Sequence, residues 1–130
     1  MSPPRWPRTA PRSTATGCSA AWPPRPVLSD PWDLLLAGPA PDAVRIGLAL
    51  PLSGPLALTA PSALDLAELA AEEATAAGVA GDRRVELVAV DSGRAPSVVA
   101  AEVAALQSAG VLAGLVGLHT SDVHLSLIHI

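Results

Sequence analysis

The sequence predicts an α/β fold in which a parallel sheet forms part of a doubly wound lobe. Three short apolar runs alternate with two segments of helical periodicity. This alternation is typical of parallel strands joined by helices that cover the faces of the sheet. The predicted elements, in the order β-α-β-α-β, are strands at 44–50, 84–90 and 111–118 and helices at 62–77 and 96–109.

The first strand is predicted to be buried, and the third is predicted to be buried on both faces. Residues 44–50 (VRIGLAL) form a largely apolar, β-branched run that ends at Pro51. Such runs are typical of strands in the middle of a parallel sheet. Residues 111–118 (VLAGLVGL) are apolar throughout. Residues 84–90 (RVELVAV) alternate between polar and apolar at first and then are apolar up to Asp91.

Both predicted helices are amphipathic. In the first, the apolar positions at helical spacing are Leu66, Leu69, Ala70 and Ala74, and acidic residues group largely on the other side. In the second, Val99, Val103 and Leu106 share one face.

The ends of these helices carry the expected signals. Pro96 suits a first helical turn, whereas Ala95 is a poor N-cap. Gly78 and Gly110 stand where C-terminal caps belong.

Residues 1–43 differ in composition from the rest of the chain. They contain ten of the 14 prolines and no apolar periodicity, so we predict a Pro/Arg-rich leader that is disordered or polyproline-like. Residues 15–18 (ATGC) look like the end of a lipoprotein signal with Cys18 as the lipidated residue. The apolar stretch of about 7 to 15 residues that such a signal needs is missing, so no convincing signal peptide is predicted.

The last seven residues, 124–130, are predicted to be a non-native tail. They contain two of the three isoleucines in the chain, Ile128 and Ile130. The segment resembles translated read-through of a sequencing adapter, and the alternative is a native apolar helix or strand. Residues 44–123 then remain as the folded part.

Composition excludes several classes of protein. The 130 residues suffice for one domain. A net charge of −4 disfavours nucleic-acid binding. No run approaches the roughly 18 apolar residues of a membrane span, and the lone Cys18 cannot form an intramolecular disulfide.

A ligand site is expected at the carboxyl ends of the strands, as in other open parallel sheets. The loops there are 51–54 (PLSG), 91–93 (DSG) and 119–122 (HTSD), which predict a polar, neutral site.

Catalytic and cofactor motifs are missing. A dinucleotide site would need G-x-G-x-x-G after the first strand; Asp91 fits the acidic position, but the glycines are absent. A phosphate-accepting receiver would need paired acidic residues there. Ser53 and Ser121 lack a G-x-S-x-G setting, and His119, His124 and His129 lack metal-ligand spacing. We therefore predict no enzyme, no cofactor and no metal site.

The ordered series of segments resembles the start of a type I periplasmic binding protein, closest to the branched-chain amino acid, urea and amide receptors. The resemblance covers residues 44–123 and is carried by IGLALPLSGP at 46–55, LAAEE at 69–73 with AAG at 76–78, VELV to Asp91 at 85–91, and 110–117 with Ser121. Two departures are Thr75, where relatives usually carry Asn, and Ala95, where they carry Asp.

This resemblance implies two lobes that close on a small polar solute, which an ABC importer's permease then accepts. It implies that Ser121 binds the ligand's carboxylate or amide, that Ser53 borders the cleft, and that His119 and Thr120 lie beside it. The chain is expected to be a truncated N-terminal fragment of such a protein, with a periplasmic or extracytoplasmic location. The alternatives are a cytoplasmic amide or amino-acid sensor that regulates transcription, and a fragment of an unrelated nucleotide-binding α/β enzyme.

Overall fold

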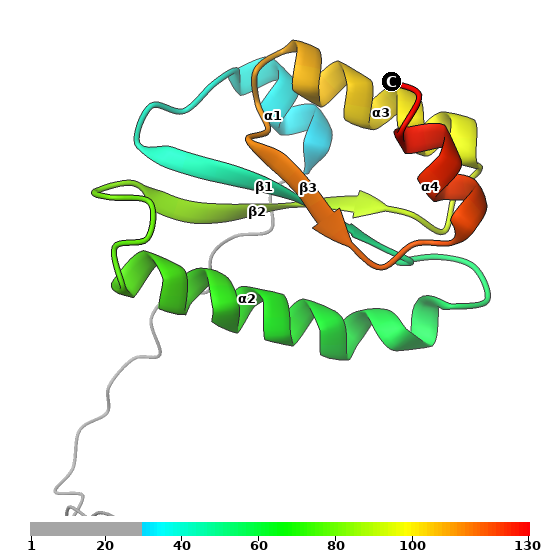
Figure 1. Cartoon of the computed structure of the whole chain (residues 1–130), viewed down its shortest axis with the longest axis horizontal. Helices are drawn as coiled ribbons and strands as arrows, with labels where there is room; N and C mark the ends of the chain where they lie inside the picture. The colour runs from blue at the N-terminus through cyan, green and yellow to red at the C-terminus, as the bar shows by residue number, and fades with distance from the viewer. Residues whose placement is uncertain (1–29) are drawn as a thin grey trace, which may run out of the picture.

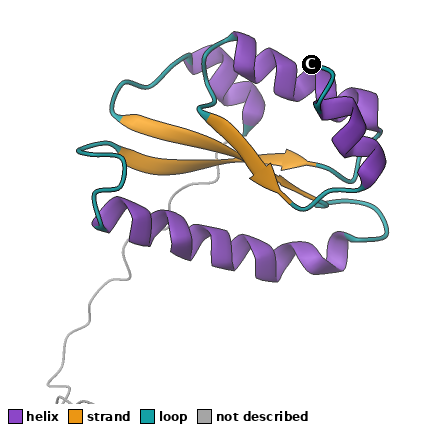
Figure 2. Ribbon diagram, in the orientation of Figure 1, coloured by secondary structure: helices purple, strands orange, loops and turns teal. Residues whose placement is uncertain are grey.

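A three-stranded parallel sheet lies between two layers of helices in the computed structural model, which describes residues 30–130 (Figure 1). Helix α2 covers one face, and α1, α3 and α4 cover the other (Figure 2). In chain order the elements are α1 (Pro31–Ala37), β1 (Ala43–Leu50), the 3-10 helix η1 (Ala57–Thr59), α2 (Ala60–Ala76), β2 (Arg84–Asp91), α3 (Pro96–Ser108), β3 (Gly114–Gly117) and α4 (Ser121–Leu127).

The strand order is β2-β1-β3, and both pairs are parallel. Val44 pairs with Val85 in the β1–β2 ladder, and Ile46 pairs with Gly114 in the β1–β3 ladder. This arrangement confirms the predicted α/β class and the β-α-β-α-β order.

The apolar core is divided by the sheet into two parts. The core under α3 contains Val88 and Val90 of β2 together with Val99, Val103 and Leu106, all of them fully buried. The predicted inner face of α3 is therefore confirmed, and the alternation along β2 sends Leu87 to the opposite core under α2.

The predicted inner face of α2 is wrong. Leu66 and Leu69 are 67% and 51% exposed, whereas the helix contacts the sheet through Leu64 and the small residues Ala60, Ala67 and Ala71. Alanine faces let a helix approach a sheet closely, and strand residues such as Leu48 supply the bulk between them. The two leucines at helical spacing, Leu66 and Leu69, therefore point to the wrong side of the helix.

The third strand is shorter and more exposed than predicted. Only residues 114–117 form β3, and Val111 is instead used to close the end of α3. Val116 is 54% and Leu118 is 53% exposed. In the part of the chain that the structure describes, β3 lies at the edge of the sheet, so the prediction of burial on both faces was wrong.

Glycines close both long helices through the same backbone motif. After α3, the amide of Gly110 donates to Gln107 at 2.9 Å and that of Val111 donates to Leu106 at 3.0 Å. This is the Schellman arrangement, which needs a left-handed residue; Gly110 has φ 67° and Gly78 has φ 66°. The predicted caps at both positions are confirmed.

Replacing Gly110 with alanine is expected to lower the free energy of unfolding by about 1 kcal/mol, because an L-residue is strained at this positive φ. Urea denaturation followed by circular dichroism measures the change. Gly114→Ala is the control, since a Cβ there meets no atom within 4 Å. Equal stability of the two variants would contradict the explanation.

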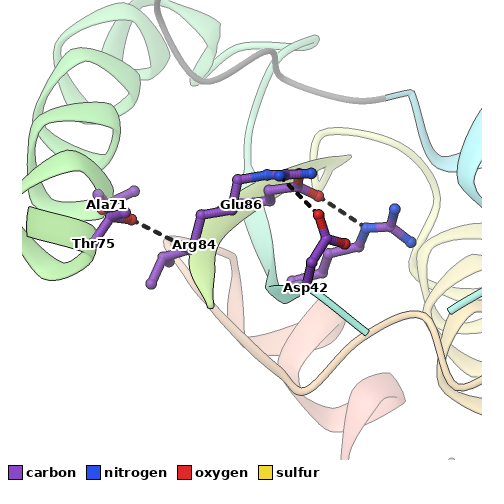
Figure 3. A network of polar contacts seen from close by, with 7 residues as sticks. Asp42, Ala71, Thr75, Arg84 and Glu86 are labelled. Atoms are coloured by element: carbon purple, nitrogen blue, oxygen red, sulfur yellow. Dashed lines mark hydrogen bonds and ion pairs between the residues drawn. The ribbon is translucent and has the colours of Figure 1, made fainter. Parts of the chain in front are cut away.

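A polar network holds the amino ends of the strands (Figure 3). Arg84 donates to Asp42 at 2.9 Å and to Glu86 at 2.7 Å, and Arg45 donates to the other oxygen of Glu86 at 3.0 Å. Nearby, the hydroxyl of Thr75 donates to Ala71 within α2 and accepts from the amide of Val85 in β2. Thr75 thus ties α2 to the sheet, at the edge opposite the predicted ligand site.

The segment before β1 contains a short helix where the sequence predicted no regular structure. Helix α1 begins at Pro31 with Asp30 as its N-cap, and it buries Leu34 against α3. The lipoprotein hypothesis for Cys18 lies outside the described residues. Within residues 30–130, none of the helices has the length and apolar character needed to cross a bilayer.

Candidate functional site

The loops that follow the three strands meet at one edge of the sheet. The loop after β1 leads to α2 on one face, whereas the loop after β3 leads to α4 on the opposite face (Figure 1). In open parallel sheets, a crevice opens where adjacent strands send their connections to opposite faces, and ligands bind there. Strands β1 and β3 form such an adjacent pair.

A cavity of about 310 Å³ occupies this position. That volume is at the small end of the range of about 300 to 1,000 Å³ for ligand sites, and it fits a small solute. The lining comprises Pro51, Ser53, Pro55, Leu56 and Thr59 from the loop after β1, Ser92, Gly93 and Arg94 from the loop after β2, and Leu118, His119, Thr120, Asp122 and Val123 from the loop after β3 and the start of α4.

Asp91 joins the first two of these loops. One carboxylate oxygen accepts hydrogen bonds from the amides of Leu52 at 3.0 Å, Ser53 at 3.2 Å and Gly93 at 2.8 Å. The side chain at the end of β2 therefore fixes the backbone of the loop after β1. Asp91 matches the acidic position of a dinucleotide site in the sequence, but its carboxylate is occupied by amides of the chain itself.

The pKa of the Asp91 carboxyl reflects this setting. Burial acts to raise the pKa, but hydrogen bonds from the Ser53 hydroxyl and from the three loop amides outweigh it, so the pKa lies below its ordinary value. Asp91 is therefore held as a carboxylate.

Gly93 lets the first two loops come into contact. A Cβ at this position would overlap the carbonyl of Ser53 and lie 2.9 Å from its hydroxyl oxygen. The buried hydroxyl of Ser92 donates to the carbonyl of Leu118 at 3.1 Å and so attaches the third loop. The three loops thus form one hydrogen-bonded unit around the cavity.

Two charged side chains line the cavity, which corrects the expectation of a neutral site. The guanidinium of Arg94 donates to Glu102 at 2.7 Å and to the carbonyl of Asp91 at 3.2 Å. Its hydrogen bond to Glu102 raises the pKa of Arg94. The carboxylate of Asp122 accepts from the Thr120 hydroxyl, and this bond lowers the pKa of Asp122.

The four ligand-binding residues predicted from the sequence separate into two groups. Ser53, His119 and Thr120 all line the cavity. Ser121 begins α4 and lines a neighbouring hollow, which it shares with His119 and His124. The structure thus brings three of the predicted residues together, while Ser121 lies just outside, and the ligand-binding roles of all four stay predictions.

His119 contacts a second histidine on α4. Its Nε2 lies 3.1 Å from Nδ1 of His124, and the two rings stack with centroids 5.3 Å apart. The Nδ1 atom of His119 is buried and has no hydrogen-bond partner among the described residues. One ring nitrogen therefore fixes the orientation of the imidazole beside the cavity.

Sequence reasoning missed several residues of the site. Thr59 and Arg94 line the cavity but were not selected, because Thr59 lies at the end of η1 and Arg94 lies one residue beyond the predicted loop 91–93. The signal for Thr59 is its position just before α2, and that for Arg94 is the spacing of eight residues from Glu102. Within residues 30–130, no three His, Cys, Asp or Glu side chains group as a metal site would require.

A comparison with protein families agrees with this geometry. The model of the periplasmic binding protein family, described as "Periplasmic binding protein", matches residues 43–130. The chain belongs to this family. Periplasmic binding proteins bind solutes, are generally not enzymes and are typically extracytoplasmic. No curated protein and no solved structure matches the chain significantly.

Proposed function

We propose that this periplasmic binding protein is the substrate-binding component of an ABC importer for a small polar solute, such as a branched-chain amino acid, urea or an amide. The observation that carries the proposal is the cavity between the loops after β1 and β3, which has the size and position of a solute site. In this proposal the protein acts outside the cytoplasm and passes its solute to the importer's permease.

Hydrogen-bonding side chains are available for such a solute. The hydroxyls of Ser53 and Thr120 and the imidazole of His119 line the cavity, and Ser121 adjoins it. Prolines and leucines make up much of the remaining wall. We assign these four residues to solute binding.

The proposal predicts that the protein binds leucine, urea or acetamide. A double variant that carries both Ser53→Ala and Thr120→Ala should bind about tenfold more weakly. Each lost hydrogen bond costs about 0.5 to 1.5 kcal/mol. Titration of ¹⁵N-labelled protein, followed by the amide shifts of Ser53, Gly93 and Thr120, measures the dissociation constant even when binding is weak.

Ser108→Ala serves as the matched control, since Ser108 ends α3 and does not line the cavity. The control should bind as the wild type does. The proposal fails if none of the three solutes shifts the loop amides, or if the double variant and the control bind equally well.

A further inference from the structure

An apolar ridge runs along the side of α2 that faces away from the sheet. Leu66 and Leu69 are 67% and 51% exposed, and Leu58 of η1 is 93% exposed. Residues three or four positions apart are neighbours on a helix surface, so Leu66 and Leu69 form one continuous patch. Large apolar side chains gathered on a surface in this way mark a site that binds another segment of protein.

The charges beside this ridge are all negative. Helix α2 contains four acidic residues and no arginine or lysine. Asp65, Leu69 and Glu73 follow one another at spacings of four residues, so the two exposed carboxylates lie at either end of the leucine patch. Within residues 30–130, neither of these carboxylates forms an ion pair with an arginine. A second copy of α2 would bring like charges together, which costs free energy. The partner of this surface should therefore be both basic and apolar.

The amino-terminal segment of the same chain has this composition. Residues 1–29 contain no acidic residue, seven prolines, the tryptophans Trp6 and Trp22, and the arginines Arg5, Arg8, Arg12 and Arg25. The four arginines balance the four acidic residues of α2. Tryptophan and arginine are the side chains that most often supply binding energy at interfaces. Prolines reduce the entropy that a segment loses on binding.

This segment is long enough to reach α2. It joins the described fold at Asp30, directly before α1, and α1 lies on the face of the sheet opposite to α2 (Figure 2). At about 3.1 Å per residue, a proline-rich segment of this length spans about 90 Å. Helix α2 has 17 residues and is about 26 Å long. Residues 1–29 can therefore pass the edge of the sheet and lie along the whole helix.

From these observations we propose that the outer face of α2 is the docking site for residues 1–29 of the same chain. This outer face comprises Leu58, Asp65, Leu66, Leu69 and Glu73. Tryptophans of the segment cover the leucines, and its arginines pair with the carboxylates. Because the segment is tethered, its effective concentration is high, and individually weak pairs suffice. The docking is separate from solute binding, since none of these five residues lines the cavity.

A spin label on Cys18 tests the proposal in the full-length protein. Cys18 is the only cysteine in the chain, so a nitroxide can be attached within residues 1–29 without any substitution. In ¹⁵N-labelled protein, the nitroxide should broaden the amide signals of Leu66, Leu69 and Glu73. The signal of Val98 on α3, which covers the opposite face, should stay sharp. The broadening should shrink at high salt, because ion pairs between exposed groups are screened.

Variants of the outer face show whether its charge and its leucines hold the segment. Asp65→Lys should lower the ratio of docked to undocked chains about threefold, and Leu66→Ser with Leu69→Ser should lower it about tenfold. The matched controls are Asp82→Lys, in the exposed turn before β2, and Val98→Ser, at a 48% exposed position on α3. Both controls should dock as the wild type does. Unchanged amide shifts in the sheet show that each variant is folded.

The outcomes separate docking within the chain from other contacts. Sharp signals throughout α2, equal broadening on both faces of the sheet, or broadening that survives both outer-face variants overturns the proposal. A mixture of ¹⁵N-labelled protein without nitroxide and unlabelled protein with nitroxide distinguishes the source of the segment. Broadening of α2 in this mixture shows that a second copy is the occupant and overturns docking within the chain. Sharp signals in the mixture, with broadening in the singly labelled chain, support it.

Discussion

Alanine in place of Gly93 is expected to lower the free energy of unfolding by about 3 kcal/mol and to weaken solute binding at the same time. The added Cβ would overlap the carbonyl of Ser53, and the atoms it meets first belong to the backbone. Backbone cannot move aside as a flexible side chain can, so the two loops must separate. Overpacking of this kind costs about 1 to 3 kcal/mol.

Separation of the loops would also break the bonds that Asp91 makes to them. Urea denaturation measures the loss of stability, and amide hydrogen exchange at Leu52 and Ser53 should accelerate as their bonds to Asp91 open. Gly114→Ala is the control, because a Cβ there meets no atom within 4 Å. A Gly93→Ala protein as stable as this control would show that the loops are not in tight contact.

The strands and helices were predictable because each has a local signal of its own. Val99, Val103 and Leu106 recur at helical spacing, and the same residues fill the core under α3. The prediction of the buried face of α2 failed for a physical reason. Which face contacts the sheet depends on how closely the helix approaches it, and local sequence does not encode this distance. Leu66 and Leu69 look like core residues and are exposed.

The site was predictable only in outline. The rule that ligands bind at the carboxyl ends of parallel strands selected the loops 51–54 and 119–122. Within them the family resemblance pointed to Ser53, His119 and Thr120, which line the cavity, and to Ser121, which does not. Whether a charged side chain at the cavity is available to a ligand was not predictable. For Arg94 this depends on its ion pair with Glu102 of α3, eight residues further along the chain. The role of Asp91 as a link between loops likewise depends on which amides the fold brings to it.

Replacing Asp91 with alanine is expected to cost about 2 kcal/mol of unfolding free energy and to weaken solute binding. The variant leaves the amides of Leu52, Ser53 and Gly93 without their acceptor, and water can replace only part of what the carboxylate supplies. The loop after β1 would then lose its fixed position beside the cavity. Chemical denaturation and the solute titrations above measure the two effects.

The pH dependence of stability distinguishes the charge of Asp91 from its shape. Because folding lowers the pKa of this carboxyl below its ordinary value of 3.8, the ionised group stabilises the fold above that pH. The contribution is lost as pH falls through the lower pKa of the folded state. Asp91→Asn keeps the shape without the charge, so it should be less stable than the wild type at pH 7, and the difference should shrink below pH 3.8. A difference that stays constant across this range would mean that the carboxylate charge does not hold the loops.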